Sequence, residues 1–371
     1  MKTGAAETTN FKYRALRDWL VENIDKGRFQ YGDKLPSENM LCSKFSVSRQ
    51  TVRKALDELE DLGAIERRKG SGSYVKKQIL KPKNNMVGVC MSFLDNYIFP
   101  EVLSGIEGIL SEAGYGIDLG FGHNRVENEA KFLERMIDSN VAGLIVEGIK
   151  SALPNPNIEY YKALVANKVP IVFVNNYYPD FQCTSVLMDD KKWTYEITRL
   201  LVEAGHKKIA GYFKFDDLQG HWRYAGYVRA LMDAGLEVNE NCIGWYDSSN
   251  TAHSPQKMDM LEEDFICSID ECTALVCYND FVAKRLIHKL NKQGRNVPDD
   301  ISIVGFDNSV DAKINGNDLT SVNHPKEKVG IEAAQRLLHL IKHPDEIREE
   351  RVCCYMPSFI RERSSIKKIS E

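Results

Sequence analysis

The sequence of 371 residues lacks the features that would indicate a membrane protein, a secreted protein or a nucleotide-binding enzyme. No stretch approaches the ~20 consecutive apolar residues that cross a bilayer. Residues 1–11 have no apolar core of the kind that a signal peptide needs. No G-x-x-x-x-G-K-[ST] motif occurs, and no G-x-G-x-x-G motif follows a predicted strand. We therefore expect a cytoplasmic globular protein with no membrane partner.

The cysteine pattern also argues against disulfides and metal sites. The chain has nine cysteines, an odd number, and no C-x-x-C pair. Several lie in apolar runs, so we expect buried free thiols in a reducing compartment. Cys267, Cys272 and Cys277 are close in sequence, but they fall across a helix end and a strand. We predict no metal and no cofactor.

The net charge of −4 conceals a division along the chain. Residues 1–83 hold 18 Lys and Arg residues against 11 Asp and Glu residues, a formal charge of +7. The rest of the chain therefore has a charge of −11. Such asymmetry indicates that one end meets a polyanion, although two unrelated solvated surfaces would give the same numbers.

The basic end has the pattern of a winged helix-turn-helix. Apolar spacing and helix caps predict helices at residues 11–26, 37–45 and 48–62. Two short strands at 64–68 and 74–75 then enclose a glycine-rich tip. We assign residues 1–75 to a DNA-binding domain. Residues 76–85 are polar, contain a proline and read as a linker.

The third helix of this domain carries side chains suited to double-stranded DNA. Arg49 and Arg53 can donate to guanine, and Gln50 can pair with adenine. The hydroxyls of Ser48 and Thr51 suit phosphate oxygens. In the wing, Lys69 and Gly70 form a thin cationic tip that could lie beside a minor groove. A merely solvated helix face is the alternative, but the Gly-rich wing and the basic segment favour DNA.

This region resembles the GntR family of bacterial regulators. The matching segments are GDKLPSEN at 32–39, FSVSRQTVRKAL at 45–56 and RKGSGSYV at 68–75. Asn39 stands where other members often carry Arg. The residues that the resemblance implies as DNA contacts are Ser37, Asn39, Ser48, Arg49, Gln50, Thr51, Arg53, Lys69 and Gly70.

From residue 86 to 371, short apolar strands alternate with amphipathic helices, which predicts parallel sheets of βαβ units. The segment is long for one sheet, so we expect two α/β lobes with a cleft between them. The predicted helices include 98–113, 126–139, 190–204, 221–235, 279–293 and 326–342. The predicted strands are 86–92, 116–121, 142–147, 170–175, 185–188, 208–213, 242–246, 273–278, 301–306 and 319–323.

Polar and aromatic side chains follow six of these strands, where ligands bind in open α/β sheets. Carboxylates and amides can hold vicinal hydroxyls, and aromatic rings can cover a sugar face, so an uncharged polyol is the best match. Singly, each residue could equally cap a helix or face solvent. The candidate effector residues are Asp95, Tyr97, Glu147, Asn175, Gln219, His221, Arg223, Asn279 and Asp307.

This second region resembles the effector domain of LacI-type regulators, which has the fold of periplasmic sugar-binding proteins. The matching segments are GHKKIAG at 205–211, RYAGY at 223–227, CYND at 277–280, VPDDISIVGFD at 297–307 and LTSV at 319–322. The resemblance implies that Arg223 and Asp307, and more loosely Asn279, hold sugar hydroxyls.

The segments DDLQG at 216–220, CYND at 277–280 and LTSVNHPK at 319–326 are similar to arabinose-responsive regulators that combine these two domain types. That similarity implies L-arabinose as the effector and His324 as a cleft residue on a strand that crosses between the lobes. We therefore predict a homodimeric transcriptional repressor whose operator half-sites lie about one helical turn apart.

Two alternatives remain open. The same architecture could respond to another pentose or hexose, because pocket shape decides that choice. A sugar-acting enzyme could use Asp95, Glu147, Asp217 and His221 as acid and base. The sequence has no nucleophile elbow, metal pair or phosphate loop to support this, so we predict that the protein is not an enzyme.

Overall fold

The structure is a computed structural model that describes residues 13, 16–24, 28–61, 63–68, 71–76, 84–92, 98–249, 255–313, 318–347 and 350–369. The chain divides into two compact units, Met1–Lys83 and Asn84–Glu371. Most of the predicted linker, residues 77–83, lies outside the described residues. No described helix is long and apolar enough to span a bilayer.

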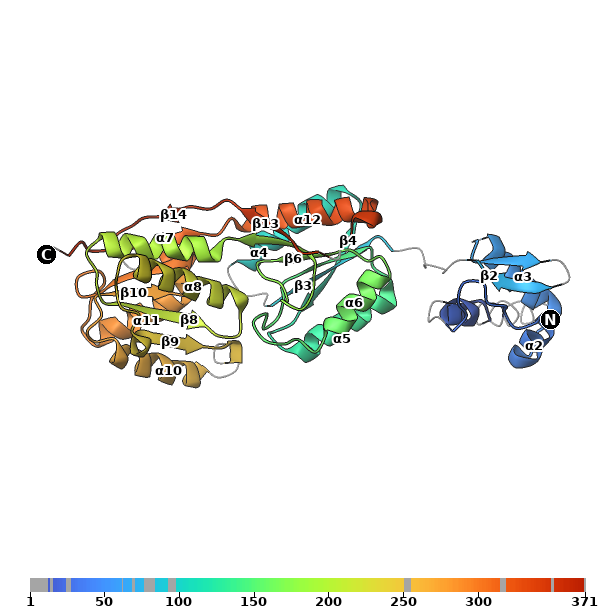
Figure 1. The fold of residues 1–371 in the computed structure, drawn as a ribbon, viewed down its shortest axis with the longest axis horizontal. Coiled ribbons are helices and arrows are strands. Elements are labelled where there is room, and N and C mark those ends of the chain that lie inside the picture. The colour runs from blue at the N-terminus through green and yellow to red at the C-terminus, as the bar shows by residue number, and fades with distance from the viewer. Residues whose placement is uncertain are drawn as a thin grey trace, which may run out of the picture. The chain divides into compact units, whose positions relative to one another are not determined.

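The first unit is a winged helix-turn-helix, as predicted (Figure 1). Residues 16–24 are helical and precede α2 (Glu38–Phe45) and α3 (Arg49–Asp61). Strands β1 (Ile65–Arg68) and β2 (Gly72–Val75) form the antiparallel wing.

Local sequence explains the sharp turn between α2 and α3. The Ser37 side chain accepts a hydrogen bond from the Met40 amide and caps α2. Ser46 ends the helix in the left-handed conformation, with φ 50°. Leu41 and Val52 from the two helices are fully buried in one core, and wing residue Ile65 also belongs to it. This core therefore fixes α3 against the wing.

The second unit consists of two α/β lobes, confirming the predicted fold class (Figure 1). The sheet of the first lobe is entirely parallel. Its strands, in spatial order, are β13 (Val352–Met356), β7 (Thr184–Met188), β6 (Ile171–Val174), β5 (Gly143–Val146), β3 (Met86–Met91) and β4 (Gly116–Phe121). The helices that cover it are α4 (Phe99–Glu112), α5 (Val126–Ser139), α6 (Ile158–Ala166) and α12 (Lys326–Lys342).

The second lobe repeats this plan, except that its edge strand β14 is antiparallel. Its strands, in spatial order, are β14 (Ile360–Arg361), β12 (Thr320–Asn323), β11 (Ser302–Asp307), β10 (Ala274–Cys277), β8 (Ile209–Lys214) and β9 (Ile243–Tyr246). Its helices are α7 (Asp190–Glu203), α8 (Leu218–Asp233), α10 (Pro255–Ser268) and α11 (Asp280–Lys292). Short 3-10 helices are η1 (Glu240–Cys242), η2 (Val310–Ala312) and, in the first lobe, η3 (Pro344–Glu346).

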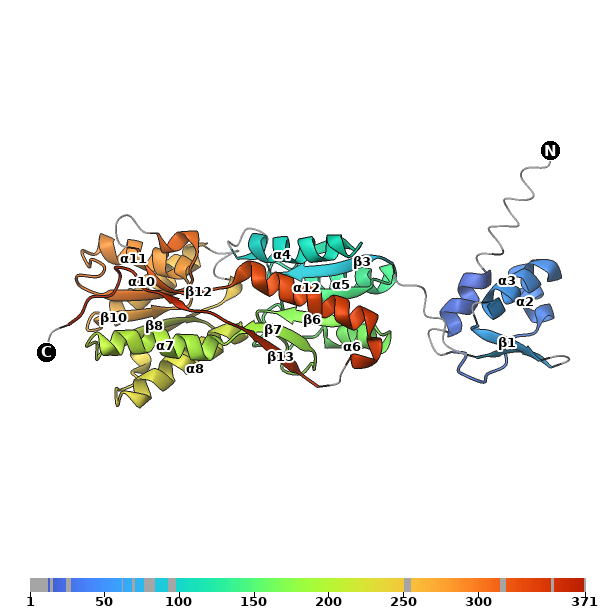
Figure 2. The same ribbon diagram turned by 90° about the horizontal axis from the view of Figure 1, so that it is seen from above.

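The chain passes between the lobes three times: from β7 to α7, from β12 to α12, and from β13 to β14. Figure 2 shows the red C-terminal segment running along both lobes. The first sheet therefore takes its edge strand β13 from the far end of the sequence. These crossings connect the loops that face each other at the lobe boundary.

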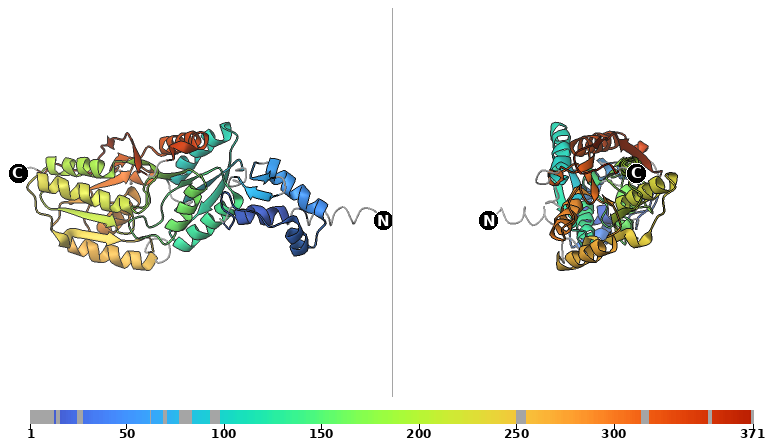
Figure 3. Two further views of the ribbon diagram at one scale, coloured as in Figure 1. Left: turned by 45° about the vertical axis from the view of Figure 1, so that its right-hand side comes forward. Right: turned by 90° about the vertical axis from the view of Figure 1, so that its left-hand side faces the viewer.

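Helices lie on both faces of each sheet, as the left view of Figure 3 shows. In the first lobe, α4 and α12 approach closely at two glycines. A Cβ added to Gly105 would stand 2.3 Å from the Glu327 carbonyl oxygen, and one added to Gly330 would stand 2.1 Å from the Val102 carbonyl oxygen. The backbones of these helices touch because neither glycine has a side chain.

All ten strands predicted for the second unit are present, with ends that differ by one residue at most. Helices α6 and α10 lie in gaps between predicted strands for which no helix bounds were given, and strands β13 and β14 were not predicted. The expectation of buried thiols is correct for Cys90, Cys183, Cys272 and Cys277 only. Cys267 is exposed and the other four are partly exposed; Cys353 and Cys354 lie on the edge strand β13.

Candidate nucleic-acid interface and effector site

The start of α3 presents an exposed polar surface in the first unit. Ser48, Arg49, Gln50 and Arg53 are all exposed there. Thr51 is buried instead, and its hydroxyl oxygen lies 2.9 Å from the Ser48 hydroxyl. Ser48 also accepts a hydrogen bond from the Thr51 amide. These two hydroxyls thus form the helix cap, which leaves Arg49, Gln50 and Arg53 to face a partner.

Side chains of α2 position both arginines. Arg49 donates to Oδ1 of Asn39 at 2.8 Å, and Arg53 forms an ion pair with Glu38 at 3.1 Å. Ser37, which caps α2, is also exposed. The helix-turn-helix therefore gathers the predicted residues of 37–53 onto one polar surface, with Thr51 turned inward.

The wing carries a further cation next to its tip. Arg68 stacks on the Tyr74 ring, 4.4 Å from the ring centroid, and pairs with Glu66. Gly72 has φ +118°, a conformation that favours glycine. The predicted contacts Lys69 and Gly70 lie outside the described residues.

In the second unit, Glu147 occupies the boundary between the lobes. It directly follows β5 and is only 5% exposed. Its carboxylate accepts hydrogen bonds from the Ser92 amide and from Nδ2 of Asn175, each at 3.1 Å. Burial nevertheless raises the pKa of Glu147 to about 7. Glu147 thus holds the ends of three strands together and can change charge near neutral pH.

Asn175 also links Glu147 to His324 across the lobes. Its Oδ1 lies 3.1 Å from Nε2 of His324, which follows β12. Because Oδ1 can only accept, Nε2 must carry the ring proton. Burial, followed by the nearby charges of Lys326 and Arg223, lowers the pKa of His324 to about 3. The ring is therefore neutral, and its buried Nδ1 is an acceptor with no partner among the described residues.

Arg223 is the buried cation of the site. Its Nε donates to Asp190 at 2.8 Å, and its Nη2 lies 3.6 Å from Asp307. The guanidinium also stacks 3.6 Å from the centroid of Phe306. Burial raises the pKa of Asp190 to about 7, although Arg223 opposes the shift. Within the described part of the chain, the buried Oδ2 of Asp190 makes no hydrogen bond.

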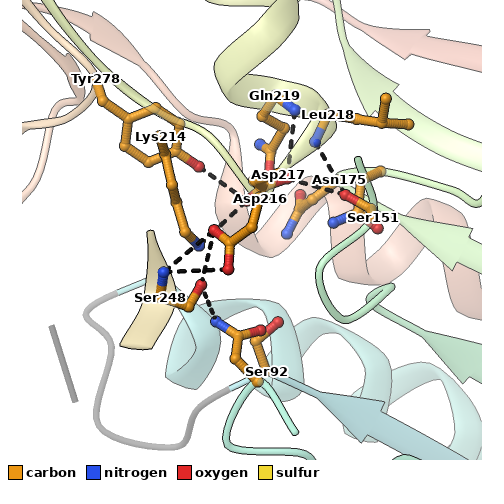
Figure 4. Close-up of polar contacts among 12 residues, drawn as sticks. Ser92, Ser151, Asn175, Lys214, Asp216, Asp217, Leu218, Gln219, Ser248 and Tyr278 are labelled. Carbon is orange, nitrogen blue, oxygen red and sulfur yellow. Dashed lines mark hydrogen bonds and ion pairs between the residues drawn. The ribbon is translucent and has the colours of Figure 1, made fainter. Parts of the chain in front are cut away.

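Two adjacent carboxylates, Asp216 and Asp217, lie on the second lobe, and Asp217 receives a contact from the first lobe (Figure 4). Asp217 accepts from the Ser151 hydroxyl at 3.1 Å and from the Tyr278 hydroxyl at 3.0 Å. Lys214 lies 3.4 Å from Asp217. Burial opposes the positive charge of Lys214, but Asp217 and Asp216 outweigh it and raise its pKa. Asp216 accepts hydrogen bonds from the backbone amide and the hydroxyl of Ser248.

The structure brings together five of the ten predicted effector residues, namely Glu147, Asn175, Arg223, Asp307 and His324. Asn279 uses its side chain to cap α11. His221 is exposed, and its Nε2 lies 2.7 Å from the Phe215 carbonyl oxygen, beside the Trp245 ring. Gln219 is buried at the start of α8. Asp95 and Tyr97 lie outside the described residues.

Asp190 was not predicted, although it lies two residues beyond a predicted strand, where polar side chains are expected to meet a ligand. Asn124, Ser151 and Ser248 were not predicted either, because they belong to no distinctive motif. The described residues contain no group of three His, Cys, Asp or Glu side chains that could hold a metal. The site instead offers buried acceptors beside one guanidinium, which suits a ligand rich in hydroxyls.

Comparisons with known proteins agree with both units. Residues 12–75 match the model for bacterial regulatory proteins of the gntR family, and residues 198–366 match that for a periplasmic binding protein-like domain. The arabinose metabolism transcriptional repressor of Geobacillus stearothermophilus is 36% identical, over 98% of this chain and 100% of its own length. The protein of the same name from Halalkalibacterium halodurans is 34% identical, over 97% and 98%.

Solved structures show the same fold. The transcription regulator CcpA of Lactococcus lactis aligns with a TM-score of 0.65 and 28% identity, covering 76% of this chain and 99% of its own. A complex of the transcriptional regulator CelR with cellobiose aligns with a TM-score of 0.67 and 23% identity, covering 86% and 91%. The second likeness concerns the fold alone.

Proposed function

The chain belongs to the gntR family of bacterial regulatory proteins, within the group of transcriptional repressors that carry a periplasmic binding protein-like domain, and we propose that its effector is L-arabinose. It is a sugar-responsive DNA-binding repressor rather than an enzyme. The proposal assigns operator DNA to residues 1–75 and sugar to residues 86–371, with 76–85 as the linker.

One structural observation carries the proposal of a sugar in the interlobe site. His324 Nδ1 and Asp190 Oδ2 are buried acceptors without a partner among the described residues. A buried acceptor left unpaired costs about 1–3 kcal/mol, so a bound hydroxyl donor would be favoured there. Arg223 lies next to Asp190 and can donate to a sugar oxygen. The identity of this sugar rests on the similarity to the two arabinose metabolism transcriptional repressors, which align over nearly the whole chain.

The proposed mechanism is a shift between two forms of a cytoplasmic homodimer. The DNA-binding domains of the two protomers, residues 1–75 of each, would contact operator half-sites about one helical turn apart, ~34 Å. Sugar would bind the form with closed lobes more tightly than the open form, and this difference sets the size of its effect. A coupling of about 1–3 kcal/mol would weaken operator binding about 5–150-fold.

Calorimetry and operator-binding titrations test the effector. We expect L-arabinose to give binding heat and to release operator DNA, whereas D-xylose and D-galactose should require higher concentrations. No heat and no release with L-arabinose would contradict the assignment. Release by D-xylose or D-galactose at lower concentration would assign the site to another sugar.

The substitution Arg223→Lys tests the site itself. Lysine keeps a positive charge between Asp190 and Asp307 but loses the planar fork of donors. We expect sugar affinity to fall at least about 10-fold while sugar-free operator affinity is retained.

Arg49→Ala should have the opposite effect, weakening operator binding by about 5–150-fold and leaving sugar affinity unchanged. Arg17→Ala is the matched control, because Arg17 pairs with Asp18 and Glu58 away from the start of α3.

If L-arabinose released operator DNA from the Arg223→Lys variant at the same concentration as from the unmodified protein, the proposed site would be wrong.

A further inference from the structure

A short chain of buried hydrogen bonds joins the two lobes. Asn124 follows β4 of the first lobe, and its Nδ2 donates to Oγ of Ser248 at 2.7 Å. Ser248 follows β9 of the second lobe and donates its hydroxyl to Asp216 at 3.1 Å. Asn124, Ser248 and Asp216 are 6%, 2% and 2% exposed. Figure 4 shows Asp216 and Ser248 facing each other.

Asp216 fixes the direction of this chain. Its carboxylate accepts both the backbone amide and the hydroxyl of Ser248. The Ser248 proton therefore points toward Asp216, and the oxygen lone pairs remain for the Asn124 amide. Asn124 can use this acceptor only while the lobes are in contact. When they separate, water must replace it.

The turn that presents Asn124 has an unusual backbone. His123 and Asn124 both have positive φ values, +48° and +50°. Two successive left-handed residues other than glycine are unfavourable, and asparagine is among the residues that tolerate the conformation best. Such a conformation often marks a functional position. Here it directs the Asn124 side chain across the boundary between the lobes.

A second contact crosses the boundary one residue further along the second lobe. Ser151 of the first lobe donates to Asp217 at 3.1 Å and accepts from the Leu218 amide at 3.0 Å. Asp216 and Asp217 thus serve adjacent interlobe contacts. Asp217 is also held by Lys214 and Tyr278, whereas Asp216 is the acceptor for Ser248.

We propose that Asn124, Ser248 and Asp216 form a latch that sets how often the lobes close, and thereby the sugar concentration that releases operator DNA. The three are positioning residues, since they act through lobe closure. The inference rests on the proposed function, because it requires that closure accompanies release. Sugar must shift the population, so the closed form is the minority without sugar, and a weaker latch lowers apparent sugar affinity in proportion.

The substitution Ser248→Ala breaks the latch, and Ser249→Ala is its matched control. Ser249 is the next residue, but its hydroxyl bonds to Asp247 within the same lobe. We expect Ser248→Ala to raise the L-arabinose concentration for half-release about 3- to 10-fold, the effect of one net hydrogen bond. Ser249→Ala should match the unmodified protein, and sugar-free operator affinity should not fall in either variant.

Asn124→Gly provides a second variant that keeps the positive φ. It should raise the half-release concentration as Ser248→Ala does. The double variant should be no worse than either single one, because both substitutions remove the same hydrogen bond. Additive effects, or a half-release concentration for Ser248→Ala equal to that for Ser249→Ala, would overturn the latch.

A cross-link separates this inference from the identity of the sugar. In the double variant Asn124→Cys and Ser248→Cys, oxidised glutathione should join the two thiols, with two electrons and two protons passing to the oxidant. This should trap the closed form and weaken operator binding about 5–150-fold without any sugar. A reducing agent should restore binding. The Asn124→Cys variant alone, treated identically, controls for the nine native cysteines.

The outcomes are distinguishable. If L-arabinose has no effect on the unmodified protein but the cross-link weakens operator binding, the proposed sugar is wrong and the latch stands. If mass spectrometry finds no cross-link, or a complete cross-link that leaves operator affinity unchanged, the latch is wrong. Weaker operator binding in the cross-linked variant, together with the Ser248→Ala effect, would support both.

Discussion

Glu147 shows how one residue connects folding, charge and binding. Its carboxyl group is almost entirely removed from water, although it accepts hydrogen bonds from Ser92 and Asn175. These neutral donors do not fully compensate for lost hydration, which is why the pKa of Glu147 rises to about 7. Its position next to Asn175, which also contacts His324, couples this charge to both lobes.

The raised pKa predicts a specific pH dependence. An acid whose pKa is higher in the folded state stabilises the protein below its unfolded pKa, and loses that contribution as the pH rises through its folded pKa. Between pH 5 and 8, the Glu147 contribution should fall by about 2–3 kcal/mol at most. Glu147→Gln should remove this loss, so thermal unfolding of the variant should depend less on pH in that interval.

The control for this prediction is Glu159→Gln, because Glu159 is exposed and pairs with Lys162 on the surface of α6. Its pH dependence should match that of the unmodified protein. Asp190 and Asp280 also have pKa values raised to about 7 by burial, so part of the slope should remain in the Glu147 variant. An unchanged slope in Glu147→Gln would contradict the assignment.

The pairing of α4 with α12 determines where the chain can cross between the lobes. Residues 324–325 lead from β12 of the second lobe into α12 of the first. Helix α12 can dock against α4 only because Gly105 and Gly330 allow direct backbone contact. Figure 2 shows the two helices side by side. This contact fixes the start of α12 and therefore the neighbouring His324.

Gly105→Ala should force these helices apart. The added methyl group would meet the Glu327 backbone, which cannot rotate away as a side chain could. We expect a loss of about 1–3 kcal/mol in the free energy of unfolding, measured by denaturant titration. Gly108→Ala is a control in the same helix, where a Cβ would meet open space. It should be stabilising by up to about 1 kcal/mol. Equal stabilities for the two variants would refute the packing argument.

The elements could be predicted where a local pattern defined them. Apolar runs located ten of the twelve strands described in the two sheets. The expectation that ligands bind beyond strand ends directed attention to Glu147, Asn175, Arg223 and Asp307. Strand β13 was missed because it gains its place from pairing with β7, more than 160 residues earlier in the sequence. Asn124 and Ser248 were missed for the same reason. Their function depends on a contact that neither local sequence specifies.

At the scale of the whole chain, the unit that binds DNA is basic and the unit that responds to sugar is acidic. The +7 charge of residues 1–83 lies with the helix-turn-helix, and the −11 charge lies with the sugar-binding lobes. Much of the basic charge near α3 is already paired with acidic side chains, as in Arg53 with Glu38 and Arg67 with Asp57. These exposed pairs are weak and can be exchanged for phosphate contacts. The acidic second unit should contribute nothing to the affinity for operator DNA.

This division predicts how salt should affect operator binding. Each phosphate that the DNA-binding domain neutralises releases counterions. The logarithm of operator affinity should therefore fall linearly with the logarithm of salt concentration. Arg53→Gln should reduce the slope of this salt dependence by about 1 for each DNA-binding domain bound to the operator. Lys162→Gln, on the surface of α6 in the second unit, removes the same charge and should leave the slope unchanged. A reduced slope for Lys162→Gln would show that the body also contacts DNA, and an unchanged slope for Arg53→Gln would remove this residue from the interface.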